Sequence, residues 1–344
     1  MTASGPTVHA VVLGLDDGLT GIQSARILAR RGVPVVGLTN DRRHPYARTR
    51  VCDRVVHART KDDDLVATLL TLGPQFEERP VLFPCQDSNV DVVSRHRRQL
   101  SAYYRIVLPP TASIELLMDK ARFHAFAVEN GFRVPDTTVL SNRADAEAAA
   151  GALPYPCILK PTVRTPAWNR ATAIKAFVVG GPDELLRRYD EHQHLAETML
   201  AQELIPGPET AHYTCNLYVD ATGEPVLTHV SRKLRQWPIA TGQGCASVSV
   251  DDDEIRLLAE RFFASLDFLG LGYLEIKRHA QTGEEVLIEP NVGRPTGRSA
   301  AADAAGTELL YSLYCDALGL PRPAAPAPSP EPTTWVFLRQ DVRS

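Results

Sequence analysis

Apolar runs near the amino terminus alternate with one helical pattern. Val8–Leu13 and Val33–Leu38 have the length and composition of buried strands, and Leu19–Arg31 between them has a helical period. This β-α-β order predicts a parallel sheet. Val81–Phe83 and Ile106–Leu108 predict two more strands of the same sheet, with a helix between them.

The rest of the chain is predicted as further helices and strands, and strands dominate from Met199 onward. Helices are expected at Ser113–Glu129, Asp183–Tyr189, Asp253–Leu266 and Ala300–Leu318, and strands at Cys157–Leu159, Ile174–Val179, Met199–Ile205, His212–Val219, Pro225–Val230 and Trp335–Leu338. Gly272–Arg278 and Glu285–Glu289 predict a hairpin that turns at residues 281–283. Pro321–Pro332 predicts an extended tether, and Trp335 is expected to pack rather than bind a ligand.

A chain of 344 residues is too long for one compact core, so several lobes are expected. The pattern predicts an α/β fold that begins with a Rossmann-like parallel-sheet lobe at residues 1–110. A small α+β lobe at residues 111–198 and a large one at 199–320 follow, and residues 321–344 form the tether and terminal strand.

Composition excludes several classes of protein. Hydrophobic residues make up 44%, charged residues 23%, and the net charge of −4 favours neither nucleic acid nor an acidic membrane. No apolar run is long enough to span a bilayer, and Met1–Pro6 lacks the pattern of a signal peptide. The six cysteines form no CxxC pair. Reduced thiols in a cytoplasmic protein are therefore expected.

Three glycines occupy the first β-α turn, where a dinucleotide-binding motif would lie. Gly14, Gly18 and Gly21 have the spacing G-x-x-x-G-x-x-G, which differs from G-x-G-x-x-G. Asp16 and Asp17 would repel a pyrophosphate at the start of the helix. The turn is interpreted as a structural one, or as one that contacts a cationic or amine-bearing substrate.

The predicted C-terminal hairpin carries the strongest chemical signal. Glu275 lies on one strand, and Glu289 and Asn291 lie two apart on the next, so both point to one face. Three oxygen-bearing side chains from adjacent strands suit Mg²⁺. A solvated hairpin with scattered acids is the alternative. Leu287 and Ile288 disfavour it, because they place Glu289 at the end of a buried strand.

Six motifs in order resemble the ATP-grasp superfamily, in its carboxylate–amine ligase branch of D-aspartate ligases, D-alanine–D-alanine ligases and carbamoyl-phosphate synthetase domains. They are Met118-Asp119-Lys120, Ile158-Leu159-Lys160-Pro161, Gln202-Glu203-Leu204-Ile205, Gly207-Pro208-Glu209, Arg232-Lys233-Leu234-Arg235, and the set Glu275, Glu289 and Asn291. The resemblance covers roughly residues 8 to 318. It implies an ATP-grasp fold in which the two later lobes clasp a nucleotide.

The resemblance also implies roles for these residues. Lys120 and Lys160 would hold phosphates, the hinge at Gln202, Glu203 and Leu204 would contact adenine largely through its backbone, and Glu209 would bind ribose. Glu275, Glu289 and Asn291 would hold Mg²⁺, with Mn²⁺ as a substitute. Lys233 belongs to the basic strand of the D-aspartate ligase branch, and is expected in the catalytic site together with Arg294 and Arg298.

Two segments depart from the family pattern. Residues 162–173 contain no glycine, whereas the family's loop over the phosphates is glycine-rich; Arg164, Trp168, Asn169 and Arg170 stand there instead. The Asn-Pro-Arg end motif reads Asn291-Val292-Gly293-Arg294, followed by Pro295 to Arg298. Arg294 is the first candidate to hold the transferred phosphoryl group, and Arg298 the second.

The resulting expectation is an ATP-dependent ligase that joins a carboxylate to an amine through an acyl-phosphate and releases ADP and phosphate. A nucleotide-binding module without catalysis and a phosphotransferase are the alternatives. The partners expected are a small-molecule carboxylate and amine, with an amino acid or short peptide as the family-level choice, and neither nucleic acid nor membrane. A homodimer is a possible assembly, and the sequence leaves the oligomeric state open.

Overall fold

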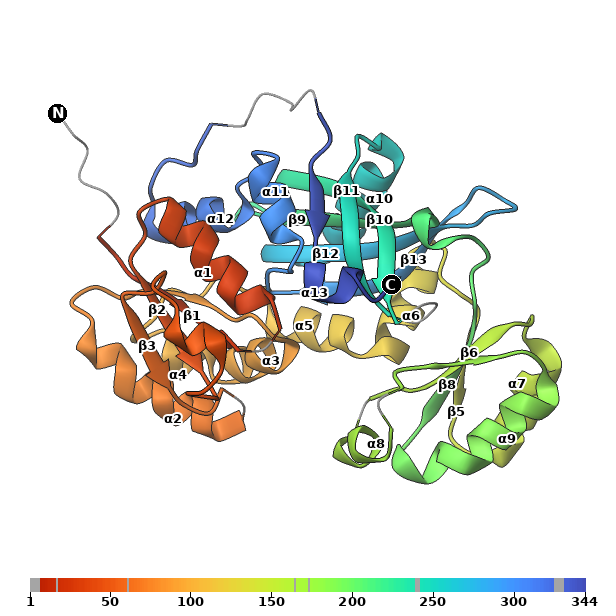
Figure 1. Cartoon of the computed structure of the whole chain (residues 1–344). Helices are drawn as coiled ribbons and strands as arrows, with labels where there is room; N and C mark the ends of the chain where they lie inside the picture. The colour runs from red at the N-terminus through yellow and green to blue at the C-terminus, as the bar shows by residue number, and fades with distance from the viewer. Residues whose placement is uncertain are drawn as a thin grey trace.

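The computed structural model describes residues 7–344, apart from 17, 61, 164, 173, 239–241 and 325–330. Its strands form three sheets, of four, six and four strands. Figure 1 shows the N-terminal lobe and the six-stranded sheet side by side, with the third sheet in a lobe that projects from them. No helix in the described part of the chain is long and apolar enough to cross a membrane.

The N-terminal lobe is built on a parallel sheet, as predicted. Its order is β3-β2-β1-β4, with strands Ala10–Val12 (β1), Val35–Thr39 (β2), Arg54–His57 (β3) and Val81–Phe83 (β4). Its helices are Thr20–Arg30 (α1), Asp62–Leu72 (α2), Asp87–Arg95 (α3) and Arg97–Leu100 (α4).

The strand predicted at Ile106–Leu108 is wrong. Only Arg105 forms a bridge, with Val81, and the chain then leaves the sheet. Pro109 and Pro110 follow directly, and proline lacks the N–H that a ladder needs. The carbonyl of Leu108 instead accepts a hydrogen bond from the Arg97 guanidinium at 3.1 Å.

The helix predicted at Ser113–Glu129 is divided in two. The two helices, α5 (Thr111–Met118) and α6 (Lys120–Glu129), meet at Asp119, whose backbone is extended at φ −86° and ψ 115°. The Asp119 carboxylate accepts hydrogen bonds from the N–H groups of Ala121 and Arg122 at 2.9 and 3.0 Å. Aspartate thus caps a new helix instead of continuing the old one.

The small lobe has its own sheet and its own core. Its strands, in the order β5-β8-β6-β7, are Thr137–Leu140 (β5), Met199–Glu203 (β8), Cys157–Pro161 (β6) and Phe177–Val179 (β7). Its helices are Arg143–Ala152 (α7), Pro166–Ala171 (α8) and Pro182–His192 (α9). Because β8 pairs with β5 and β6, this lobe extends to Glu203, beyond the boundary expected at residue 198.

The six-stranded sheet is antiparallel and runs β13-β12-β9-β10-β11-β14. Its strands are His212–Val219 (β9), Pro225–Trp237 (β10), Gln243–Ser249 (β11), Gly270–Arg278 (β12), Glu285–Val292 (β13) and Thr334–Val336 (β14). The predicted hairpin is β12–β13, and the predicted terminal strand is β14 at the sheet edge.

Four helices accompany this sheet: Asp253–Ala264 (α10), Ser299–Ala304 (α11), Leu309–Leu318 (α12) and Leu338–Asp341 (α13). The single helix predicted at Ala300–Leu318 is therefore wrong. The chain turns at Gly306, where φ is 90°, a left-handed conformation that glycine adopts without the steric cost of a Cβ atom.

The two faces of the six-stranded sheet differ in character. One face carries residues such as Cys215, Leu274 and Ile276, which pack in one core with Phe262 and Phe263 of α10. Strand alternation sends the intervening side chains to the other face, which is polar although buried. Thr214, Asn216, Ser231, Lys233 and Lys277 of this polar face are each less than a tenth exposed.

Candidate functional site

The candidate site is a pocket of about 540 Å³ between α5–α6, the small lobe and β13. Five of the predicted site residues line it: Lys120, Lys160, Gln202, Glu289 and Asn291. They come from two elements of the body, α6 and β13, and from two strands of the small lobe, β6 and β8. The pocket thus brings together the predicted phosphate-binding lysines and two of the predicted metal ligands.

Lys160 is a half-buried cation in this pocket. Its ammonium donates a hydrogen bond to Oε1 of Gln202 at 2.7 Å. Burial lowers the pKa of Lys160 to about 8; the carboxylate of Glu289 opposes this shift, and the charge of Lys120 adds to it. An ammonium that is partly removed from water and donates to the neutral Gln202 amide can bind an anion with its remaining N–H groups.

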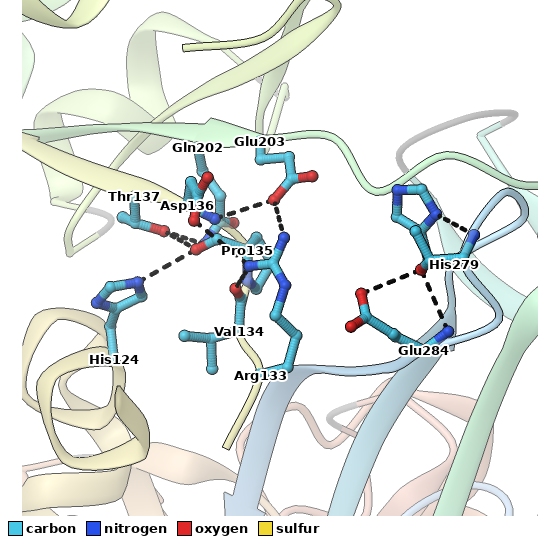
Figure 2. Close-up of polar contacts among 11 residues, drawn as sticks. His124, Arg133, Val134, Pro135, Asp136, Thr137, Gln202, Glu203, His279 and Glu284 are labelled. Atoms are coloured by element: carbon cyan, nitrogen blue, oxygen red, sulfur yellow. Dashed lines mark hydrogen bonds and ion pairs between the residues drawn. The ribbon is translucent and has the colours of Figure 1, made fainter. Parts of the chain in front are cut away.

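Of the predicted hinge residues Gln202, Glu203 and Leu204, only Gln202 lines this pocket among the described residues. Oε1 of Gln202 accepts from Lys160, and its Nε2 donates to Oγ1 of Thr137 at 2.8 Å, so the amide holds the lysine. Figure 2 shows the Glu203 carboxylate accepting from Arg133 at 2.9 Å and from the Asp136 N–H at 3.1 Å. Glu203 therefore ties the end of β8 to the entry of β5.

Neither Glu203 nor Leu204 is among the described residues that line the pocket. The entry of β5 is also tied to the body, because the imidazole of His124 on α6 lies 3.1 Å from the carbonyl of Pro135 (Figure 2). The hinge segments therefore have internal hydrogen bonds without a ligand.

The predicted metal ligands lie opposite one another on the hairpin. Glu275 pairs with Glu289 across β12 and β13, and Tyr273 pairs with Asn291. Burial raises the pKa of Glu289, and the negative charge of Glu275 raises it further, while Lys120 and Lys160 lower it. Two close carboxylates and one amide oxygen are a donor set that fits a hard divalent cation.

Two arginines hold these oxygens in the structure. Arg298 donates to Glu275 at 3.2 Å, and Arg294 donates to Asn291 and to Asp87 of the N-terminal lobe. The Arg294 guanidinium also lies 5.6 Å from the ring centroid of Tyr273. No group of three or more His, Cys, Asp or Glu suited to a metal occurs in the described residues; the predicted set needs Asn291 as its third member.

A cationic cluster covers the polar face of the sheet beside Glu275. Burial lowers the pKa of Lys233, with Glu275 opposing the shift and Arg298 adding to it. Lys277 and His212 lie directly opposite each other on β12 and β9. Burial lowers the pKa of His212 to about 2, and nearby Lys233, Lys277 and Arg298 contribute, so His212 is neutral at pH 7.

Lys277 and His212 were missed in the sequence. Lys277 lies two residues after Glu275 on β12, so strand alternation places both side chains on the same polar face of the sheet. Its pKa is lowered by burial, with Glu209 opposing the shift, so Glu209 lies near this lysine. Glu209 begins a 3-10 turn, Glu209–Ala211, directly before β9, and its side chain is half-buried.

The glycine-free segment at residues 162–173 contains the short helix α8. Trp168 is fully buried in the core of the small lobe, and its indole N–H donates to the Ile174 carbonyl at 2.9 Å. Thr165 caps α8 by accepting from the Trp168 N–H at 3.0 Å. Arg164 lies outside the described residues, and Arg170 is exposed. Trp168 therefore stabilises the lobe, and Val163 of this segment lines the pocket.

A second pocket of about 330 Å³ adjoins Arg294 and Arg298. Loop 294–298, the start of α1 and the chain end all contribute to it, including Trp335, Phe337 and Gln340. Trp335 was expected to pack rather than bind a ligand, and in the structure its side chain lines this pocket. The sequence offered no signal for this, because β14 lies far along the chain from the arginines.

Comparison with known proteins places these features in context. No family model matches the chain. The curated D-aspartate ligase of Enterococcus faecium (strain Aus0004) is 24% identical over 253 residues, which cover 70% of this chain and 59% of that protein. The chain thus matches less than two thirds of that relative's length.

Solved structures share the fold. The L-amino acid ligase from Bacillus licheniformis matches with a TM-score of 0.67 and 14% identity, covering 91% of this chain and 75% of that one. The biotin carboxylase domain of Hydrogenobacter thermophilus 2-oxoglutarate carboxylase, solved with MgADP, ADP and bicarbonate, matches with a TM-score of 0.68 and 15% identity over 92% of this chain and 70% of that one. The chain has the ATP-grasp fold and resembles the carboxylate–amine ligases of the ATP-grasp superfamily.

Proposed function

We propose that this protein is an ATP-dependent ligase that activates a carboxylate as an acyl-phosphate and transfers the acyl group to an amine. The observation that carries the proposal is the convergence of Lys120 and Lys160 with Glu289 and Asn291 at one pocket, with Glu275 paired to Glu289 across the hairpin. Cations for phosphates and oxygens for a divalent metal lie together there. A site for an uncharged ligand does not need both sets.

The nucleotide is assigned to the pocket between the lobes. Lys120 and Lys160 neutralise phosphate oxygens, and Gln202 keeps Lys160 in place through its hydrogen bond. Adenine lies against the backbone of residues 202–204, and Glu209 accepts from the ribose hydroxyls. Lys233 and Lys277 supply further positive charge beside Glu275, where the phosphate chain passes.

Glu275, Glu289 and Asn291 would hold Mg²⁺. When bound, Mg²⁺ neutralises the charge of the β- and γ-phosphates and so favours phosphoryl transfer. Arg294 and Arg298 now bind two of these oxygen ligands, so their guanidinium groups are within reach of the same phosphates. In the proposal, Arg294 holds the γ-phosphoryl group in flight and Arg298 holds the substrate carboxylate.

The reaction has two displacement steps. A carboxylate oxygen of the acid attacks the γ-phosphorus, the bond from that phosphorus to the β,γ-bridging oxygen breaks, and ADP leaves. The amine nitrogen then attacks the acyl carbon, the acyl–oxygen bond breaks, and phosphate leaves as the nitrogen loses a proton. Closure of the small lobe over the pocket limits hydrolysis of the acyl-phosphate.

The acid is proposed to be an amino acid. The named substrates of two similar proteins, D-aspartate ligase and L-amino acid ligase, support this class. The experiment is a screen of amino acids in pairs, with ATP and Mg²⁺, for coupled release of ADP. We expect ADP and phosphate only when acid and amine are both present, and no release after chelation of Mg²⁺.

Other outcomes identify other functions. Stoichiometric AMP and pyrophosphate would contradict the acyl-phosphate route. ADP release with one acceptor and no amine would make the protein a phosphotransferase. Nucleotide binding without any release of ADP would make it an inactive binding module.

A further inference from the structure

The second pocket lies beside the arginines and is closed by the end of the chain. We define the C-terminal wall as residues 334–341, which comprise β14 and α13. Opposite it lie loop 294–298 and the first turn of α1 with Leu19 and Thr20. The pocket is small for a ligand site, about 330 Å³, so it suits a compact molecule.

The charge of the pocket favours an anion. Arg294 and Arg298 line it, and none of the lining residues in the described part of the chain is an aspartate or glutamate. Arg298 uses Nη2 to bind Glu275. Its Nη1 points to the Gly244 side, 3.5 Å from the position that a Cβ atom would take on that lining glycine. A carboxylate there would accept from a guanidinium already oriented by Glu275.

Two aromatic side chains of the C-terminal wall line the pocket, and alternation along β14 accounts for the direction of Trp335. Trp335 and Phe337 line it, whereas Val336 and Leu338 are 43% and 68% exposed on the outside. The Trp335 ring lies against the loop that carries the arginines, since a Cβ atom on Gly297 would meet it at 3.5 Å. Trp335 thus limits the space next to Arg298.

Gln340 adds a polar group to the same wall. Its side chain lines the pocket, and its Oε1 is buried without a hydrogen-bond partner among the described residues. An unpaired buried acceptor is costly, so a donor on a ligand that reaches it would gain a hydrogen bond and remove this cost. The ligand therefore needs a donor, such as an ammonium or hydroxyl group, in addition to its anionic group.

The C-terminal wall is held on the sheet at several points. Ser247 and Ala246 of β11 pair with Trp335 and Val336, and the Phe337 N–H donates to the Cys245 carbonyl at 2.7 Å. Arg235 forms two hydrogen bonds with the carboxylate of Asp341, at 2.6 and 2.8 Å. These contacts place the wall in a defined position, as a specificity element requires.

We infer that the second pocket binds the acid substrate and that Trp335 and Gln340 of the C-terminal wall select it as a compact, polar carboxylate with a hydrogen-bond donor. Amino acids with small polar side chains have this chemistry. The inference rests on the proposed function, since Arg294 connects this pocket to Asn291 of the proposed metal site. It adds the selecting residues and the size of the acid.

The test measures equilibrium binding of the standard L- and D-amino acids to the full-length chain by calorimetry. We expect small polar amino acids to bind the unaltered protein and bulky apolar ones to bind weakly. Trp335→Ala and Gln340→Leu should weaken binding of the small acids about tenfold, the loss of roughly one good contact. The matched control is Val336→Ala on the outer side of β14, which should change the affinity less than about twofold.

ATP affinity is measured in parallel and should be the same in all four proteins, which excludes general damage to the fold. Trp335→Phe keeps an aromatic wall and should restore most of the acid affinity. The inference is overturned if no amino acid binds, or if the two inward variants bind the acids as Val336→Ala does. Acid binding that depends on Trp335, without ADP release on addition of any amine, would instead count against the ligase proposal alone.

Discussion

The pKa values of individual charged residues in the first pocket depend on the residues around them. Lys160 is a cation with its pKa lowered by burial, and Glu289 is a carboxylate with its pKa raised by burial and by Glu275. Each opposes the other's shift. A ligand that brings negative phosphates and a metal cation would remove the cost of both charges, which is why these two residues are the most informative to titrate and replace.

The pH dependence of nucleotide binding should report Lys160. Its pKa is about 8 in the folded protein and 10.5 ordinarily, so the ammonium loses its proton above pH 8. We expect ATP affinity to fall as pH rises through about 8, measured by calorimetry, and to stay flat in Lys160→Arg, which remains charged. An equal pH dependence in both proteins would remove Lys160 from the phosphate site.

The same shift affects stability with a definite sign. Between pH 8 and 10.5 the unfolded chain binds more protons at this lysine than the folded protein does. The free energy of unfolding without ATP should therefore gain a contribution from Lys160 that increases with pH in this window. Urea denaturation of the unaltered protein and Lys160→Met measures this contribution as the difference in their pH slopes.

Glu289→Gln should separate catalysis from folding. The substitution removes a carboxylate whose charge is disfavoured by burial and by Glu275, so stability at pH 7 should be equal or higher. Turnover should fall by at least about a hundredfold, because an oxygen ligand for the metal is lost, whereas ATP binding should persist. Near-normal ADP release by this variant would show that the proposed metal site is misplaced.

At the scale of secondary-structure elements, the first residues of helices and the two faces of strands determine where the site residues lie. Lys120 is the first residue of α6. The Asp119 cap fixes the start of this helix and therefore the backbone position from which the Lys120 side chain extends. On β12, alternation sends Tyr273 and Glu275 to the ligand face and Leu274 to the core. The same strand therefore supplies both stability and chemistry.

Removing the Asp119 cap should affect both the stability of the protein and its binding of ATP. We expect Asp119→Ala to lower the free energy of unfolding by about 1 kcal/mol, because two N–H groups lose their acceptor. The KM for ATP should rise, because the backbone of Lys120 would no longer be held in one position. Asp119→Asn keeps an acceptor oxygen and serves as the control. Unchanged stability in Asp119→Ala, measured by urea denaturation, would show that water replaces the cap at no cost.

At the scale of the molecule, the site lies between two lobes with separate cores. The small lobe has its own core and projects from the body in Figure 1. Lys160 and Gln202 of this lobe face Lys120 and Glu289 of the body across the first pocket. Hydrogen bonds such as Arg133–Glu203 join the segments that connect them.

A non-hydrolysable ATP analogue with Mg²⁺ should draw the small lobe toward the body. Its phosphates would bind Lys160 on one side and the lysine and acids of the body on the other. We expect a smaller radius of gyration by X-ray scattering and slower amide exchange in β6 and β8, with exchange in α12 unchanged as the control. Lys160→Met should lose the compaction. An unchanged radius in the unaltered protein would mean that closure does not accompany binding.

Prediction from the sequence succeeded where the signal was local. Val81–Phe83 and His212–Val219 have the predicted bounds, because each is a stretch dense in strand-forming residues that ends where the pattern ends. The strand Arg54–His57 was missed, since it lies at the sheet edge and its side chains are half-buried or exposed. An edge strand of this kind has no apolar run to detect.

The sequence by itself determined the β-α-β start, the acid-bearing hairpin and the order of the motifs that resemble the ATP-grasp superfamily, because these depend on spacing within one element or between neighbours. Only the tertiary structure decided that Lys277 and His212 join Glu275, that Glu203 binds Arg133, and that Trp335 closes a pocket beside Arg298. Those contacts depend on strand register and on pairing between residues far apart in the chain. The free energy that selects them comes from packing the whole sheet, which no local pattern records.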